Sequence, residues 1–341
     1  MKRCRSIFPP VIAAVGMFML IMDSKAALTG AAEGIDLCVK TVIPALFPFF
    51  VLSAVLTPAL MGKKTPFLNP IGRLCGIPTG AEGILFTGLL GGYPVGAQCI
   101  SQAYSAGQLS RADARRMLGF CSNAGPAFLF GMSGFLFSNK SIPFILWGIH
   151  ILSAIITGII LPSKSKSQAT PSSKATQPQN EVLQKSLRAT ANVCGWVLIF
   201  RIILTFLDRW FLWLLPHTAQ IVITGLLELS NGYIALIGIE SESLRFVLAS
   251  LFLSFGGICI MYQTASVTGQ AGLDLGLYFP GKLIQSAASA ILSIFASHFI
   301  YHDGNPIGIL IFPAIGVAGA SYIILAKIWK NSSSIPKPSV V

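Results

Sequence analysis

The stretch LLGGYPVGAQ, residues 89–98, decides how this chain folds. It lies inside an apolar run, residues 83–100, long enough to cross a membrane as one helix. Glycine gives up backbone entropy in a helix, and proline lacks an N–H and clashes with the preceding turn. The three glycines and one proline of GGYPVG therefore predict a helix that breaks at membrane depth, where unpaired backbone groups cost most.

Apolar runs of similar length recur along the whole chain. Of its 341 residues, 53% are hydrophobic and 11% are charged, and the mean hydropathy is +0.72. Soluble domains carry about 25% charged residues, and membrane barrel strands are short and alternate in polarity. The sequence therefore predicts an all-α integral membrane protein, a polytopic helical bundle. Its further predicted spans are residues 7–22, 42–60, 124–137, 142–161, 191–215, 219–239, 246–262, 283–300 and 307–329.

The net charge of +12 lies between these runs rather than on one folded soluble domain. That pattern follows the positive-inside rule and predicts both termini, the segment after residue 60, the region around Arg111 and the central linker in the cytoplasm. We expect the first apolar run to be retained as an anchor rather than cleaved as a signal. No segment is large enough to form a basic face for nucleic acid, so nucleic acid is not an expected partner. The expected partners are the lipid bilayer and a small molecule.

A polar linker separates two hydrophobic halves. Residues 162–179 read PSKSKSQATPSSKATQPQ, a composition typical of a flexible segment. We therefore predict a first membrane half (1–161), a cytoplasmic linker (162–180) and a second membrane half (181–341). A shift of 165 positions lays GGYPVGAQCIS over GGICIMYQTAS, which predicts a repeat whose second broken helix begins at Gly256. Many transporters place their substrate site where two such broken helices meet.

A second candidate for the site is the segment SNAGPAF, which begins at Ser122. Ser122 or Asn123 would cap a helix, and Pro126 suits its first turn. A helix start presents unpaired N–H groups and partial positive charge, which suit a carboxylate. Upstream, three arginines either anchor a short helix to anionic headgroups or attract an anionic substrate; they are Arg111, Arg115 and Arg116.

Glu228 is an acid within a predicted span, with Asn231 on the same helix face. Acids in spans are costly and mark candidate functional sites. Glu228 could serve ion coupling, contact substrate, or pair with Arg201 or Arg209. The seven cysteines and four histidines show no metal-binding or catalytic spacing. We therefore predict no catalytic residue, no metal, no cofactor and no enzyme activity, while H⁺ or Na⁺ stays open as a coupling ion.

The sequence resembles the Gate-domain, or nucleoside-recognition, membrane proteins, and among them the sporulation integral membrane proteins of the YlbJ/SpoVV type. The resemblance rests on GLLGGYPVGAQ, RADARRMLGFCSNAGPAFLFG, GLLELSNG and SFGGICIMYQTAS. It implies two Gate repeats, with a plan related to concentrative nucleoside transporters. Carried over by motif, the substrate site would comprise Gly91, Gly92, Tyr93, Pro94, Gly96, Gln98, Asn123, Gly125, Pro126, Glu228, Asn231 and Gln263. The chain departs from the pattern at Met261 and Tyr262, which replace the smaller Gly96 and Ala97 of the first half.

The resemblance also implies a function and a location. YlbJ-type members are linked to moving dipicolinic acid across the outer forespore membrane. We therefore expect a transporter of a small organic anion, with dipicolinic acid as the first candidate. A nucleoside transporter and a non-transporting membrane scaffold for spore maturation are the alternatives, and the oligomeric state is open.

Overall fold

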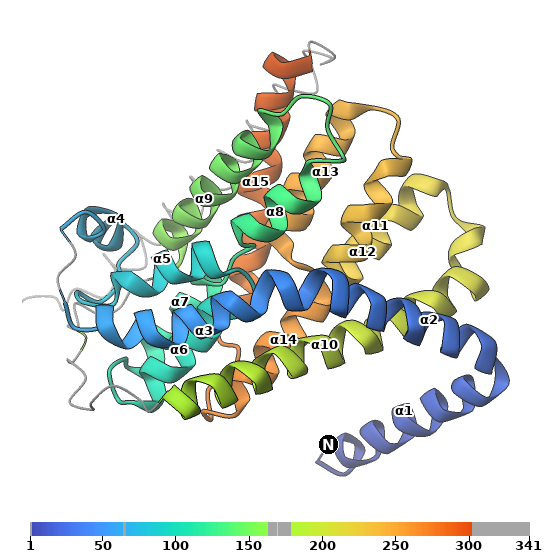
Figure 1. Cartoon of the computed structure of the whole chain (residues 1–341), viewed down its shortest axis with the longest axis horizontal. Helices are drawn as coiled ribbons and strands as arrows, with labels where there is room; N and C mark the ends of the chain where they lie inside the picture. Colours follow the sequence, from blue (N-terminus) through green and yellow to red (C-terminus); the bar gives the residue numbers. More distant parts are fainter. Residues whose placement is uncertain (1, 64–65, 163–168, 170–178, 302–341) are drawn as a thin grey trace, which may run out of the picture.

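The computed structural model describes residues 2–63, 66–162, 169 and 179–301, in which every element is a helix (Figure 1). The predicted all-α membrane fold is confirmed. Five helical segments of the described chain are long and apolar enough to span a membrane: Ser24–Thr57, Ile142–Ile160, Glu181–Trp210, Glu242–Gly269 and Tyr278–Tyr301. The predicted span 307–329 and nearly all of the predicted linker lie outside the described residues.

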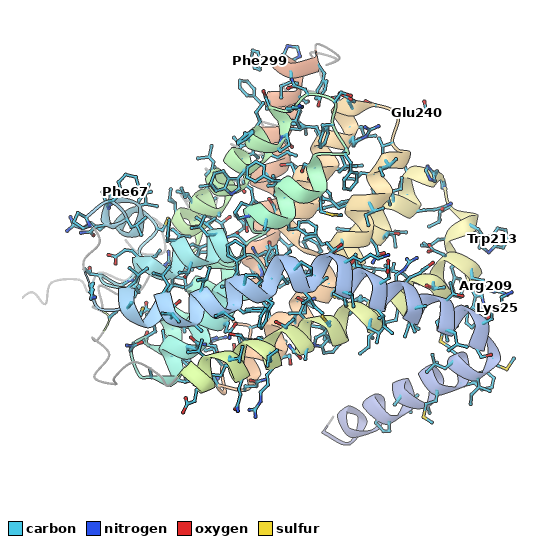
Figure 2. All side chains as sticks on the ribbon, viewed as in Figure 1. Lys25, Phe67, Arg209, Trp213, Glu240 and Phe299 are labelled. Atoms are coloured by element: carbon cyan, nitrogen blue, oxygen red, sulfur yellow. The ribbon has the colours of Figure 1, made fainter. Side chains whose placement is uncertain are left out.

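Large apolar side chains lie on the outside of the molecule. Phe67, Trp213 and Phe299 are 88%, 66% and 63% exposed and project from its periphery (Figure 2). Soluble proteins rarely carry so many exposed large apolar residues, whereas lipid contacts them without cost. The exposed side chains and the long apolar helices together make this a multi-pass membrane protein.

The described chain forms two series of helices with the same order of shapes. Each series has a long helix, a helical hairpin, a broken helix and a final span. In the first series these are α2 (Ser24–Leu37), η1 (Cys38–Val42) and α3 (Ile43–Leu60); α5 (Glu82–Gly91) and α6 (Val95–Ser105); α7 (Arg111–Cys121) and α8 (Pro126–Ser133); and α9 (Ile142–Ile160). In the second they are α10 (Gln179–Trp210); α11 (His217–Leu227) and α12 (Leu229–Ala235); α13 (Glu242–Phe255) and α14 (Gly257–Gly269); and α15 (Tyr278–Tyr301).

Four short or peripheral helices lie outside this order. α1 (Lys2–Met22) precedes the first series, and α4 (Asn69–Leu74) precedes its hairpin. Two 3₁₀ turns flank the second hairpin, η2 (Leu212–Leu214) and η3 (Leu236–Gly238). None of them interrupts the correspondence between the two series.

The two broken helices run in opposite directions. α13 begins where the first broken helix ends, because Arg245 Nη1 donates to the Leu136 carbonyl at 2.7 Å. At the other end of the molecule Asp274, which follows α14, pairs with Arg111 and Arg115 of α7 at 2.9 and 2.7 Å. The two series are therefore an inverted repeat.

The long helices obey the same inversion. α2 packs along α10, where a Cβ added to Gly30 would meet Thr205 and one added to Gly34 would meet Leu198. Positions rise along α2 as they fall along α10, so the two helices are antiparallel. Small residues at the contact let the backbones approach closely, as is common between membrane helices.

Glycines lie at the close contacts of both hairpins, which we call hairpin 1 (α5 and α6) and hairpin 2 (α11 and α12). A Cβ added to Gly88 or to Gly96 would overlap the Cys121 carbonyl, so α5 and α6 lie together against the end of α7. In the second hairpin a Cβ on Gly232 would overlap the backbone of Gly225. The predicted break at residues 91–96 is thus the turn of a re-entrant hairpin, with a cis Tyr93–Pro94 peptide.

Three sequence predictions need correction. Residues 219–239 do not form one span but fold back at Glu228 as α11 and α12. Residues 124–137 hold only α8, the second part of a broken helix. The repeat with a shift of 165 is wrong, because it matches a hairpin turn to the break of a long helix; residues 92–94 correspond to Glu228, and residues 122–125 correspond to Gly256.

The three arginines of α7 do not act as a group. Arg111 and Arg115 are exposed and paired with Asp274. Arg116 is buried and donates to the carbonyls of Cys75, Gly76, Gly158 and Leu161, which lie at the ends of α4 and α9. Its fork of donors satisfies helix-end carbonyls, so neither predicted role, headgroup anchor or anion attraction, fits Arg116.

Candidate functional site

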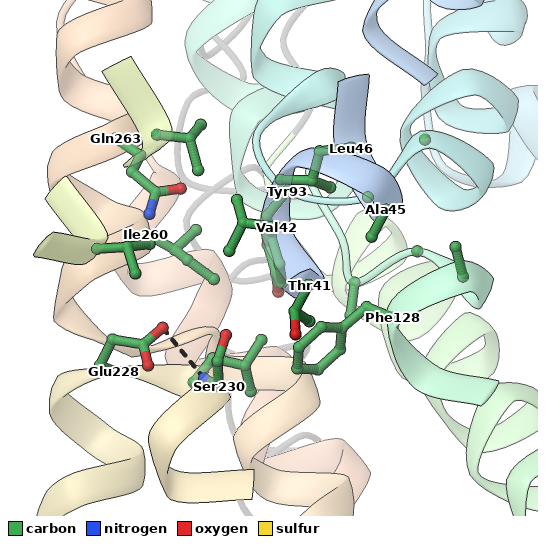
Figure 3. Close-up of a pocket in the computed structure, with 18 of the residues that line it drawn as sticks. Thr41, Val42, Ala45, Leu46, Tyr93, Phe128, Glu228, Ser230, Ile260 and Gln263 are labelled. Atoms are coloured by element: carbon green, nitrogen blue, oxygen red, sulfur yellow. Dashed lines mark hydrogen bonds between the residues drawn. The ribbon is translucent and has the colours of Figure 1, made fainter. Parts of the chain in front are cut away.

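Both hairpin tips and both broken helices meet around one central cavity of about 60 Å³ (Figure 3). That volume holds a few water molecules, so an organic ligand requires these elements to move apart. The cavity is lined from hairpin 1 by Leu90, Gly91, Gly92 and Tyr93; from the first broken helix by Ala124, Gly125, Ala127 and Phe128; from hairpin 2 by Glu228, Leu229 and Ser230; and from α14 by Ile260 and Gln263. The long helices add Thr41, Val42, Ala45, Leu46, Val193 and Val197.

Glu228 is the acid of this cavity. It occupies the tip of hairpin 2 and caps α12, accepting bonds from the backbone N–H groups of Ser230 at 3.1 Å and Asn231 at 2.7 Å. The Asn231 side-chain amide donates to the same carboxylate at 2.6 Å. Arg201 pairs with Glu33 and Arg209 with Asp23, so neither arginine pairs with Glu228 as one alternative proposed. The helix start stabilises the negative charge instead.

The start of α8 also opens toward the cavity. α8 begins after Gly125 with Pro126 in its first turn, and Gly125, Ala127 and Phe128 line the cavity. The first N–H groups of a helix have no partner within it, and they carry partial positive charge. This end of α8 can therefore receive a carboxylate or another acceptor.

A ring of polar contacts ties the tip of hairpin 1 to the breaks. The Tyr93 hydroxyl donates toward the carbonyls of Leu253 and Ser254 at 3.2 and 3.3 Å, at the end of α13. His150 Nε2 accepts from the Ala124 N–H at 3.0 Å, which leaves Nδ1 as the donor to the Ser254 hydroxyl at 3.2 Å. Tyr93 thus joins hairpin 1 to the second break, and His150 joins the two breaks to each other.

Lys282 of α15 completes this ring. Its side chain is buried, and Nζ donates to the Tyr93 hydroxyl at 3.1 Å, to Gln285 Oε1 at 2.7 Å and to the Ser122 carbonyl. Gln285 in turn donates to Asn123 Oδ1 at 2.8 Å. The Lys282 ammonium group and the side-chain amides of Gln285 and Asn123 therefore form a hydrogen-bonded chain that begins at the Tyr93 hydroxyl.

The structure brings half of the predicted site residues together. Gly91, Gly92, Tyr93, Gly125, Glu228 and Gln263 line the cavity. The other six do not line it. Pro94 precedes α6 as its N-cap, Pro126 begins α8, and Gly96 packs on the Cys121 carbonyl. Asn231 donates to Glu228, Asn123 forms hydrogen bonds with Phe120 and Gln285, and Gln98 lines a different cavity. A ligand-binding role for any of the twelve stays a prediction.

The cavity that Gln98 lines is larger and more polar. It measures about 450 Å³ and lies between α6, α10 and α14. Lys185, Arg188 and Gln270 also line it. It lies near the end of the molecule that carries Arg111 and Asp274, because α6 leads into α7 and Gln270 follows α14.

Sequence reasoning missed Lys282 and His150. Lys282 precedes the predicted span 283–300 by one residue, so hydropathy treats it as a flanking charge. Its helical spacing to Gln285 and Ser286 puts three polar side chains on one face, and this was the available signal. His150 stands alone in an apolar run and offered no signal.

Taken together, the fold and the site define a helical membrane protein with inverted repeats and a central cavity at paired re-entrant hairpins. Comparison with known proteins adds a similarity to the sporulation integral membrane protein YlbJ of Bacillus subtilis (strain 168). The alignment is 23% identical over 322 residues and covers 80% of this chain and 78% of the relative. It confirms the predicted resemblance to YlbJ-type sporulation membrane proteins. No family model matches the chain, no solved structure matches it significantly, and the Gate-domain assignment stays a prediction.

Proposed function

We propose that this protein transports a small organic anion across a membrane, with dipicolinic acid in spore formation as the first candidate. One observation carries the proposal: two hairpin tips and two helix breaks from an inverted repeat line the same cavity. Exposed backbone inside a membrane is tolerated where protein buries it or where it lines a cavity. Repeats inverted in this way are suited to opening a central site to either side in turn.

The chemistry around the cavity suits a carboxylate at one end. The start of α8 offers N–H donors, and Lys282 supplies positive charge behind Tyr93. The similarity to YlbJ, a sporulation integral membrane protein, supports a membrane role in spore formation, for which we propose dipicolinic acid as the substrate and the outer forespore membrane as the location. On this proposal both termini are cytoplasmic, and the protein is a carrier rather than an enzyme.

A nucleoside transporter is the second candidate, and a specific observation favours it. Glu228 and Gln263 both line the cavity, and an acid with an amide suits the hydroxyls of a ribose. Glu228 also brings negative charge into a space that an anion must enter. The two substrates therefore make opposite demands on the same residue.

Uptake by vesicles that contain the purified protein tests the proposal. Labelled dipicolinate and labelled uridine are offered separately, with protein-free vesicles as the control. Saturable uptake of dipicolinate that excess unlabelled dipicolinate abolishes supports anion transport. Uptake of uridine alone favours the nucleoside carrier, and uptake of neither favours the membrane scaffold.

A further inference from the structure

Lys282 holds a buried position beside the proposed substrate site but does not line its cavity. Its side chain is 1% exposed, although it lies on a membrane-spanning helix. None of the ion pairs among the described residues includes it. An ammonium group in such surroundings is costly unless oxygen atoms replace its water shell.

Three neutral oxygen atoms and two aromatic rings supply that shell. They belong to the Tyr93 hydroxyl, the Ser122 carbonyl and the Gln285 side chain. Nζ also lies 4.9 Å from the ring centroid of Tyr93 and 5.8 Å from that of Tyr278. The carbonyl stands just beyond the C-terminal end of α7, where a helix carries partial negative charge. Unwound carbonyls at a broken helix are the type of ligand that transporters offer to coupling cations.

The number of donors makes this cage sensitive to one proton. An ammonium group has three N–H donors and meets three acceptors here. A neutral amine has two donors and one lone pair, so loss of the proton leaves Lys282 and Tyr93 with one donor fewer between them. Either Nζ releases the Tyr93 hydroxyl, or that hydroxyl turns to donate to Nζ and releases the α13 carbonyls of Leu253 and Ser254. The Tyr93 and Ser122 contacts each join α15 to an element that lines or adjoins the central cavity: the tip of hairpin 1 and the first helix break.

From this geometry we infer that the Lys282 ammonium group does the work that a bound sodium ion does in sodium-coupled transporters. Lys282 binds and releases one proton for each anionic substrate that is transported. This rests on the proposed function. Protonated Lys282 holds the hairpin 1 tip in place and balances the charge of the anion. When the tip moves, the proton passes to water that enters the opened cavity, and the neutral amine no longer retains the anion.

Other titratable groups face Lys282 and must be separated from it experimentally. They are Tyr93 of hairpin 1, Tyr278 of α15, Cys121 of α7 and His150 of α9. The charged residues of α13, which also packs on α15, lie at the far end of that helix, where Arg245 meets Leu136. His150 is the main rival, because its protonation would remove the acceptor of the Ala124 N–H.

Substitution of Lys282 by methionine and by arginine, with Lys140→Met as an exposed control, tests the inference in vesicles. With the membrane potential clamped at zero, wild type should accumulate dipicolinate about tenfold for each pH unit by which the outside is more acidic than the inside. A sodium gradient should have no effect. Lys282→Arg should lose net uptake but keep exchange of internal for external substrate, because its charge cannot be released. Lys282→Met should lose the proton drive. Sodium-driven uptake by wild type, or proton-driven uptake by Lys282→Met, overturns the inference while leaving anion transport intact.

Hydrogen exchange gives a readout that does not depend on transport. In wild type the protection of residues 88–98 should fall through one transition as pH rises, after correction for intrinsic rates. Lys282→Arg should stay protected, Lys282→Met should stay unprotected, and Lys140→Met should follow wild type. A transition that persists in Lys282→Met assigns the proton to another group and overturns the inference. If wild type moves no dipicolinate, the proposed function fails, and this measurement still decides whether Lys282 controls hairpin 1.

Discussion

At the residue scale, Glu228 sets the charge of the central cavity. Its carboxylate is held by the start of α12 and faces a space that we propose receives an anion. A like charge about 10 Å away at an effective dielectric constant of about 20 costs about 1.7 kcal/mol. Removing the charge of Glu228 should therefore strengthen the binding of an anion. It should weaken the binding of a ligand that donates hydrogen bonds to Glu228.

Glu228→Gln should lower the KM for dipicolinate about tenfold, because the repulsion between the two negative charges is lost. It should also lower the free energy of unfolding by about 1 kcal/mol, because the cap of α12 weakens. Concentration-dependent uptake and thermal unfolding in detergent measure the two effects, and Glu240→Gln, an exposed acid, is the matched control. A higher KM for dipicolinate in Glu228→Gln would contradict anion binding in this cavity.

Gly92 is constrained by its backbone as well as by space. Its φ of 82° and ψ of 178° lie in a region that is essentially restricted to glycine, and a Cβ would lie 3.1 Å from the Gly125 nitrogen. Gly92→Ala should destabilise the protein by about 1–3 kcal/mol, whereas Gly195→Ala, with open space around it, should not. Thermal unfolding of the two purified variants checks this, and equal midpoints would argue against the hairpin turn.

At the element scale, hairpin 1 depends on a glycine contact with α7. A Cβ on Gly96 would overlap the Cys121 carbonyl, which is backbone and cannot move aside cheaply. Overpacking of this kind costs about 1–3 kcal/mol or more. Gly96→Ala should therefore reduce the amount of folded protein sharply. Gly148→Ala in α9, where nothing lies within 4 Å, should be neutral or stabilising by up to about 1 kcal/mol through helix propensity.

Membrane-inserted yield and thermal midpoint measure the Gly96 and Gly148 variants side by side. Equal values for both would mean that α6 does not pack on α7 through Gly96. The comparison concerns stability alone, since Gly96 does not line the central cavity.

At the scale of the whole molecule, the inverted repeat brings two native cysteines together. Cys38 of η1 lies against α10, where its thiol donates to the Cys194 carbonyl at 3.6 Å. Mild oxidation in membranes should link Cys38 to Cys194, because the long helices cross antiparallel at this level. Mass spectrometry of the digested protein detects the linked peptides, and Cys194→Ser should abolish them. A Cys38 thiol that forms no link to Cys194 would contradict the packing of η1 on α10.

The membrane class follows from the amino-acid sequence alone, because hydropathy is a local property that each apolar run carries independently. The sequence also locates the positions where helices are interrupted, at Gly92, Asn123 and Gly256, because glycine, proline and capping residues act on their own backbone. Whether an interruption becomes a hairpin turn or a break within a longer helix depends on tertiary packing. Residues 92–94 turn a hairpin and Gly256 continues a broken helix, because the outcome depends on the surface that meets the next segment, such as the Cys121 carbonyl against Gly88 and Gly96.

The same reason explains two polar residues whose structural setting the sequence did not predict. Glu228 was predicted inside a continuous span, yet it caps a helix at a hairpin tip, because Gly225 and Gly232 allow the chain to fold back there. Lys282 was treated as a flanking charge, yet it is buried among oxygen atoms from residues 93 and 122. Those partners lie 189 and 160 positions away, so the interaction that stabilises a buried cation exists only once the inverted repeat has assembled.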